Sequence, residues 1–141
     1  MATLVKEIPV AVSPEAAWDA ISDFGNVHER LVPGFLTASR LDGDARIVTF
    51  ANGIVLREPL VSRHDGTRRL VYGALGGRFT HYNAALQVFD AEGGSRIVWT
   101  VDLLPDEFAT VAQELMTQAA VIIKRTLESQ GAVKPSPRSS P

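Results

Sequence analysis

The chain has 141 residues, enough for one domain with a substantial core but too few for two typical domains. Its 14 basic and 16 acidic residues are interspersed and give a formal net charge of −2, so it lacks the basic stripe that nucleic-acid binding requires. It contains no cysteine, which excludes disulfides and thiolate chemistry, and no apolar run approaches the roughly 20 residues of a membrane span. We therefore expect a soluble, cytoplasmic protein with no nucleic-acid partner and no integral membrane association.

The chain begins with a predicted strand and two short helices. Residues 3–12 alternate between apolar and polar side chains, as a strand does. Ser13 and Pro14 fit the N-cap and the first position of a helix that runs to Phe24. A second short helix is predicted over residues 27–32. These helices would close one end of a sheet.

Six strand-like runs follow, each separated from the next by a short turn rich in glycine, asparagine and aspartate. Connections this short make neighbouring strands antiparallel. The predicted strands span residues 36–42, 45–51, 54–64, 69–75, 78–90 and 95–104.

A long amphipathic helix is predicted over residues 106–130. Its apolar positions recur at helical spacing and are Phe108, Val111, Ala112, Leu115, Ala119, Ile122, Ile123 and Leu127. An antiparallel sheet wrapped around one helix often leaves a concave apolar gap where small molecules bind. The expected organisation is a single α+β domain over residues 1–130. Residues 131–141 are rich in Pro and Ser and are predicted to be a disordered tail.

Glu58 is the first candidate for ligand contact or chemistry. In the run 54–64 it shares the more apolar face with Leu56 and Leu60. A carboxylate there would be desolvated, which raises its pKa unless a donor or a cation pairs with it. An internal partner with a purely structural role would explain Glu58 equally well.

Two further runs place polar groups near the same face. Tyr82 and Ala84 belong to the more apolar side of the run 78–90, so the Tyr82 hydroxyl could anchor a ligand or satisfy Glu58, and the small Ala84 could leave room beside it. A core tyrosine is the structural alternative. In the run 95–104, the apolar period places Trp99 inside and Asp102 outside.

The sequence lacks the motifs of several other common catalytic and binding sites. The three histidines lack the spacing that places two imidazoles on one face, so we predict no bound metal and no cofactor. There is no nucleophile elbow, no P-loop and no dinucleotide-binding fingerprint.

The order of the predicted elements and several local phrases resemble those of a known superfamily. The phrases are residues 13–18, 56–60, 70–72, 81–84, 96–101 and the terminal helix. Together they resemble the START/Bet v 1-like superfamily (SRPBCC), in particular its polyketide cyclase/dehydrase and lipid-transport-like members, over residues 3–129. The resemblance implies a helix-grip fold, in which a seven-stranded curved antiparallel sheet closes over the carboxy-terminal helix around a hydrophobic cavity.

The resemblance also implies positions for a ligand site. By position, Thr37, Val48, Phe50, Glu58 and Tyr82 match cavity-lining places in such proteins. The other candidate ligand-binding residues are Phe24, His28, Leu56, Ala84, Asp102, Phe108, Leu115 and Ala119.

Some implications of the resemblance differ from the residue pattern. The resemblance implies that Asp102 faces inward and Trp99 outward. The apolar period of residues 95–104 predicts the opposite. His28 stands where many relatives have an aromatic residue, and could add a titratable group at the pocket mouth. In similar plant hormone receptors, residues 51–53 would correspond to a gate and residues 76–78 to a latch, but this chain lacks their longer proline-containing gate.

Three functions are compatible with these observations. The leading hypothesis is binding of a hydrophobic small molecule, such as a lipid, isoprenoid or polyketide-like compound, for carriage or sequestration. The alternative is a polyketide cyclase, aromatase or dehydratase with Glu58 as general acid or base and Tyr82 steadying an enolate. The third is an interaction protein that uses an exposed sheet face carrying Trp99 or Phe89 to pair with another subunit. Homodimerisation could accompany either ligand hypothesis.

Overall fold

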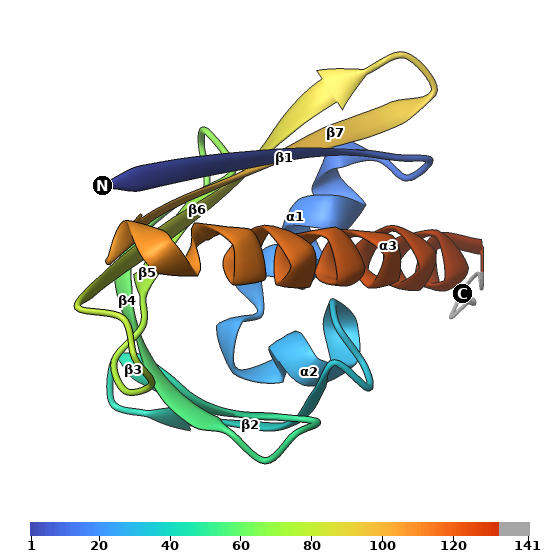
Figure 1. Cartoon of the computed structure of the whole chain (residues 1–141). Helices are drawn as coiled ribbons and strands as arrows, with labels where there is room; N and C mark the ends of the chain where they lie inside the picture. The colour runs from blue at the N-terminus through green and yellow to red at the C-terminus, as the bar shows by residue number, and fades with distance from the viewer. Residues whose placement is uncertain (133–141) are drawn as a thin grey trace.

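The computed structural model describes residues 1–132 as one curved sheet, one long helix and a few short helices (Figure 1). The strands are β1 (Ala2–Val10), β2 (Leu36–Asp42), β3 (Ala45–Phe50), β4 (Val55–His64), β5 (Arg69–Gly73), β6 (His81–Ala91) and β7 (Gly94–Leu104). The helices are α1 (Pro14–Ser22), α2 (Val27–Arg30) and α3 (Ala109–Ala132), with 3-10 turns η1 (Phe24–Asn26) and η2 (Asp106–Phe108).

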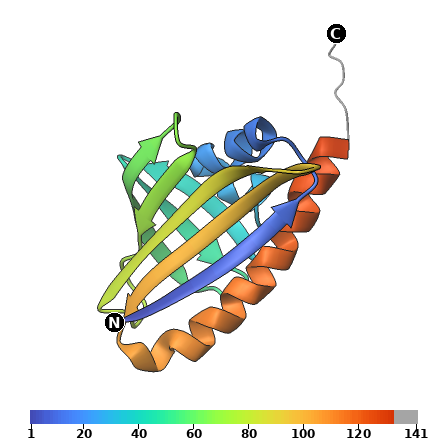
Figure 2. The ribbon, with the colours of Figure 1, turned by 90° about the horizontal axis from the view of Figure 1, so that it is seen from above.

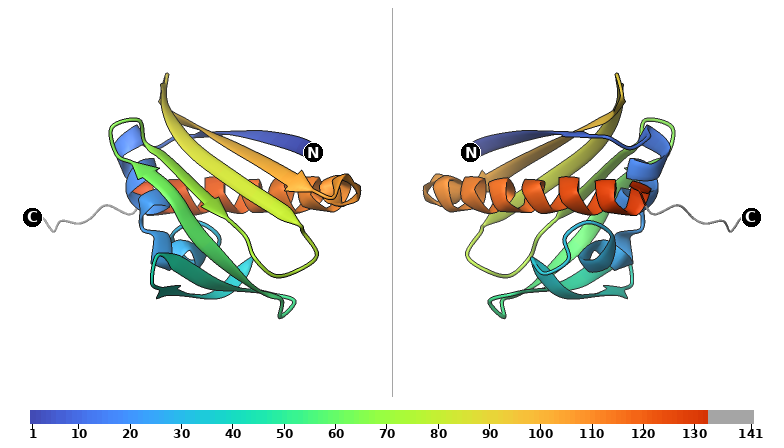
Figure 3. Two further views of the ribbon diagram at one scale, coloured as in Figure 1. Left: turned by 90° about the vertical axis from the view of Figure 1, so that its left-hand side faces the viewer. Right: turned by 90° about the vertical axis from the view of Figure 1, so that its right-hand side faces the viewer.

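The sheet is seven-stranded and antiparallel throughout. Its spatial order is β1-β7-β6-β5-β4-β3-β2, so β1 joins the meander at its last strand. The sheet curves around α3, which crosses its concave side (Figures 1 and 3). The predicted helix-grip fold is therefore confirmed.

Strands β6 and β7 bury the side chains on the inner face of the sheet. On β6, Ala84, Leu86 and Val88 are buried, and on β7 Ile97 and Trp99 are buried. This period of two confirms the predicted inner faces of both strands. The implication of the resemblance that Trp99 faces outward is wrong, because Trp99 shares its face with the fully buried core residues of β7.

The short helices close the end of the sheet near the carboxyl end of α3 (Figure 2). As predicted, the Ser13 hydroxyl caps α1 by accepting from the Ala16 N–H at 3.1 Å, and Pro14 occupies the first turn. The predicted first helix is interrupted at Asp23, and Phe24 begins η1 instead.

Helix α3 runs along β1, and it begins and ends later in the chain than predicted (Figure 2). It starts after η2 and continues to Ala132, so residues 131 and 132 are helical and not part of a tail. The remainder of the predicted tail lies outside the described residues. Among residues 1–132, no helix has the length and apolarity that crossing a bilayer requires.

Candidate functional site

A cavity of about 330 Å³ lies between the concave face of the sheet and α3. Small-molecule pockets typically measure about 300–1,000 Å³, so this cavity is of ligand size. Most of its wall is apolar and comes from the sheet, from α2 with its following loop, and from α3. The apolar wall includes Val27, Leu31, Val32, Phe35, Leu36, Phe50, Ile54, Leu56, Ala74, Phe79, Leu86, Phe108, Val111, Ala112, Leu115, Met116, Ala119 and Ile123.

The mouth of the cavity lies where the β3–β4 turn, the β5–β6 loop and the first turns of α3 meet. Ile54, Val111 and Leu115 line the cavity although they are 51%, 55% and 40% exposed. Asn52 and Gly77 contribute to the same wall, so both segments compared above with a gate and a latch reach this mouth. An apolar molecule would therefore enter over a largely apolar rim.

The polar part of the cavity wall is centred on a buried ion pair. Arg46 on β3 stands directly opposite Glu58 on β4, and its Nε donates to Glu58 Oε1 at 2.7 Å. Arg46 is 4% exposed and Glu58 is 7% exposed, and both line the cavity. Since an isolated buried charge is very costly, each residue makes the burial of the other possible.

Arg46 is held on several sides. Its Nη1 donates to the carbonyl oxygen of Phe24 at 3.2 Å. Its Cζ lies 4.1 Å from the centre of the Phe24 ring and 4.7 Å from the centre of the Tyr72 ring. A planar guanidinium stacks well on aromatic faces, so η1 and β5 fix the cation that β3 carries.

Glu58 has a perturbed pKa. Burial raises the pKa of Glu58 above its ordinary value, and the charge and hydrogen bond of Arg46 offset this rise only in part. Groups with such shifts inside a cavity are candidates for proton transfer, although structural ion pairs show them too.

Two tyrosines complete the polar part of the wall. Burial raises the pKa of Tyr72 and of Tyr82 well above the ordinary tyrosine value, and the nearby Glu58 carboxylate adds to the rise. Both hydroxyls therefore keep their proton at neutral pH. The neighbouring Trp99 side chain lowers the pKa of the Tyr72 hydroxyl but does not outweigh the effect of burial, and Trp99 Nε1 is itself buried without a hydrogen-bond partner among residues 1–132.

The structure brings several of the residues predicted from the sequence to this cavity. Those in its wall are Phe50, Leu56, Glu58, Tyr82, Phe108, Leu115 and Ala119. They come from β3, β4, β6, η2 and α3 and converge although they are far apart in the sequence. Val48 and Ala84 lie on the same inner faces and are fully buried, but they pack outside the cavity wall.

Four other predicted ligand-binding residues lie off the cavity wall. Phe24 packs against Arg46 and supports the site from behind. His28 is half-buried on α2 and does not reach the wall. Thr37 is exposed, because it follows Leu36, which faces the cavity, and successive strand residues point to opposite faces; β2 is also irregular between Leu36 and Ala38.

Asp102 is the fourth predicted ligand-binding residue that lies off the cavity wall. It is on the outer face of β7, where it accepts a hydrogen bond from the Thr3 hydroxyl on β1 at 2.7 Å. The inward orientation implied by the resemblance is therefore wrong, and the orientation predicted from the apolar period is confirmed.

Arg46, Tyr72 and Trp99 line the cavity but were not among the predicted site residues. Arg46 could have been found from the hairpin, because a turn centred on Asn52 places residue 46 opposite residue 58. Tyr72 offered only a weak signal, since all of β5 after its first residue is buried. Trp99 was predicted from the apolar period to face inward but was not named as a ligand-binding residue.

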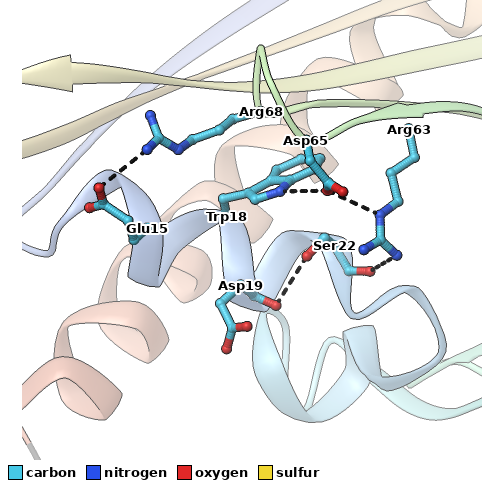
Figure 4. A pocket seen from close by; sticks show the side chains of 7 residues that line it. All are labelled: Glu15, Trp18, Asp19, Ser22, Arg63, Asp65 and Arg68. Carbon is cyan, nitrogen blue, oxygen red and sulfur yellow. Dashed lines mark hydrogen bonds and ion pairs between the residues drawn. The ribbon is translucent and has the colours of Figure 1, made fainter.

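A second hollow lies on the surface between α1 and the β4–β5 turn and is polar (Figure 4). The Trp18 Nε1 donates to Asp65 Oδ1 at 3.1 Å, and Arg63 Nε lies 3.5 Å from the same oxygen. Arg68 pairs with Glu15 at 3.3 Å. The charged side chains of this hollow are partly or fully exposed and form ion pairs, which is typical of a solvated surface. We therefore place the candidate site in the cavity beneath α3.

Sequence comparison agrees with this geometry. Residues 1–129 match the family described as polyketide cyclase / dehydrase and lipid transport. A search of curated proteins finds no match to this chain.

Solved structures share the fold at low sequence identity. An uncharacterised protein from Bacillus thuringiensis has a TM-score of 0.80 and 19% identity, over 89% of this chain and 98% of that one. The protein XoxI from Bacillus cereus has a TM-score of 0.80 and 21% identity, over 94% and 97%. A point mutant of norcoclaurine synthase from Thalictrum flavum, solved with a transition-state analogue, has a TM-score of 0.68 and 19% identity, over 92% and 95%.

Such identities establish the fold alone, but the family match spans nearly all of the described chain. The START/Bet v 1-like resemblance is confirmed by this match together with the helix-grip architecture. The chain belongs to the polyketide cyclase/dehydrase and lipid transport family.

Proposed function

We propose that the protein binds a mainly apolar small molecule, such as a lipid, isoprenoid or polyketide-like compound, inside the cavity for carriage or sequestration. The observation that carries this proposal is a cavity of about 330 Å³ with a mainly apolar wall, a mouth lined largely by apolar side chains and one buried polar cluster. Burial of apolar surface supplies affinity, and a few fixed polar groups orient the ligand. Norcoclaurine synthase, with its bound transition-state analogue, supports the proposal as an example of this fold acting on a small molecule.

Native mass spectrometry of the protein purified from its own host tests this proposal. We expect a stoichiometric adduct that denaturing chromatography releases as a hydrophobic compound. A protein that carries no adduct, and binds none of a panel of hydrophobic compounds, would contradict carriage.

Two variants of α3 then locate the ligand. Leu115→Trp places a larger ring at the cavity mouth, and we expect loss of the adduct. Val121→Trp is the matched control, because Val121 is also an exposed apolar residue of the same helix, at 58% against 40% for Leu115, but does not line the cavity. Equal loss of the adduct in both variants would place the ligand elsewhere.

An enzyme of the cyclase, aromatase or dehydratase kind is the second candidate. The Glu58 carboxylate, with its raised pKa, and the neutral Tyr82 hydroxyl line the same cavity. Such a pair has the components for moving a proton beside a carbonyl group. Glu58→Gln separates the two functions: turnover lost with binding retained supports the enzyme, and changed affinity with no turnover in either protein supports the carrier.

A further inference from the structure

The polar groups of the cavity wall include donors that are neutral and available. Tyr82 is packed against Phe79, with ring centres 5.1 Å apart, and burial raises the pKa of its hydroxyl, so the hydroxyl keeps its proton and can donate it to an acceptor in the cavity. Trp99 is 8% exposed, and its Nε1 has no hydrogen-bond partner among residues 1–132. A buried donor without a partner is costly, so a ligand that supplies an acceptor here gains affinity.

The charges of the inner polar cluster are already balanced, whereas Arg78, which also lines the cavity, is exposed near Phe108 at the mouth. Arg46 and Glu58 contribute one positive and one negative charge in a wall that water scarcely reaches. Arg46 donates through Nε to Glu58 and through Nη1 to the Phe24 carbonyl, so neither edge of the guanidinium is wholly free for a bidentate carboxylate. An anionic ligand would add a second negative charge beside Glu58 in a site of low dielectric.

We infer that the cavity selects neutral ligands whose inner end carries an uncharged oxygen acceptor, such as a ketone, aldehyde or ester carbonyl, and rejects carboxylates of the same shape. This inference rests on the proposed binding function and narrows its ligand class. The acceptor lies against the Tyr82 hydroxyl and the neighbouring Tyr72 and Trp99 donors, while the apolar body of the ligand fills the space toward the mouth.

Three probes of similar shape test this selection. They are 2-acetylnaphthalene, which carries a neutral carbonyl, 2-ethylnaphthalene, which carries no oxygen, and 2-naphthoate, which is an anion at pH 7.5. Isothermal titration calorimetry gives the affinity of the wild-type protein for each. We expect 2-acetylnaphthalene to bind about 3- to 10-fold more tightly than 2-ethylnaphthalene, as one net hydrogen bond would give. We expect 2-naphthoate to bind most weakly of the three.

Variants of Tyr82, Tyr72 and Glu58 test whether these side chains cause the preference for a neutral carbonyl. Tyr82→Phe keeps the ring and removes the donor, so it lowers the preference for 2-acetylnaphthalene over 2-ethylnaphthalene. Tyr72→Phe does the same if its hydroxyl shares the acceptor. Glu58→Gln removes the competing negative charge and raises the affinity for 2-naphthoate about tenfold, as a newly available charged hydrogen bond would. Glu7→Gln is the control of equal charge change, because Glu7 is exposed on β1 and paired with Arg96 far from the cavity.

The results separate this inference from the binding function on which it rests. A wild-type protein that binds 2-naphthoate as tightly as 2-acetylnaphthalene, or that does not prefer 2-acetylnaphthalene over 2-ethylnaphthalene, overturns the inference and leaves the binding function standing. If none of the probes binds, the compound released in native mass spectrometry decides: a carboxylate overturns the inference and a neutral oxygen-bearing compound supports it. If there is also no such compound, both proposals fail. If Glu58→Gln does not fold, Tyr82→Phe still tests whether a hydroxyl donor causes the preference for the carbonyl compound.

Discussion

Trp99 and Asp102 lie on the same strand, β7, and point to opposite faces of the sheet. Trp99 is buried in the cavity wall, whereas Asp102 accepts a hydrogen bond from Thr3 on the outer face. Two residues that are an odd number of positions apart on a strand point to opposite faces of the sheet. One strand therefore carries both a cavity-facing and a solvent-facing side chain.

Substitution of the two residues should therefore have unequal effects. We expect Trp99→Ala to lower the free energy of unfolding by about 3 kcal/mol, because it removes a large buried ring. Asp102→Ala should change that free energy by no more than about 0.5 kcal/mol. Urea unfolding of both variants measures the difference. A larger loss from Asp102→Ala would contradict the assigned faces.

The ion pair of the cavity wall should be sensitive to removal of one partner. Arg46→Met leaves the Glu58 carboxylate buried without its cation, and we expect a loss of about 3–5 kcal/mol in the free energy of unfolding at neutral pH. The pKa of Glu58 should rise further, since the two effects that lower it both come from Arg46. Joint replacement by Arg46→Met and Glu58→Leu should recover most of the loss. Equal destabilisation by the single and double variants would show that the pairing itself matters little.

Glu58 should also make stability depend on pH. Its pKa is higher in the folded protein than the ordinary value of 4.5, so the folded state holds the proton more tightly than the unfolded chain does. The stability that this group contributes is fully present below that ordinary pKa and is lost as the pH rises through the folded pKa. We expect the free energy of unfolding of the wild type, minus that of Glu58→Gln, to decrease as the pH rises above 4.5. A difference that stays constant or increases would be evidence against the raised pKa.

Gly94 marks a close approach between β7 and the end of β1. A Cβ atom at this position would overlap the carbonyl oxygen of Val10 and press on Ala11. We expect Gly94→Ala to lower the free energy of unfolding by about 3 kcal/mol, since the backbone must move to admit the methyl group. Gly66→Ala is the matched control, because open space surrounds Gly66 and the loss there should be within about 0.5 kcal/mol. Comparable melting temperatures for the two variants would disprove the close approach.

The fold was predictable because local signals along the chain agree with one another. Short turns containing glycine, asparagine or aspartate impose antiparallel pairing, and the helical spacing of Ala112, Ala119 and Ile123 requires a covering layer. The apolar period of β7 also assigned Trp99 to the correct face.

The site was harder to predict, because its geometry depends on relationships between strands. Thr37 was placed in the wall only by its position match with the superfamily, and it is exposed because its neighbour Leu36 takes the inward place on β2. Arg46 looks like an ordinary surface charge within β3 and becomes a buried cation only when the register opposite Glu58 is considered. The two aromatic rings that cover it come from η1 and β5, which no local pattern connects to β3.

The enclosure of Arg46 limits how this protein can change over evolutionary time. A lysine at this position would lack the planar group that Phe24 and Tyr72 cover on their respective sides, and a neutral residue would strand the carboxylate of Glu58. A single substitution at either position should therefore destabilise the fold, whereas replacement of both residues together should cost less. Positions 46 and 58 should accordingly change together across descendants of this sequence, so that a lineage which loses the arginine also loses the glutamate.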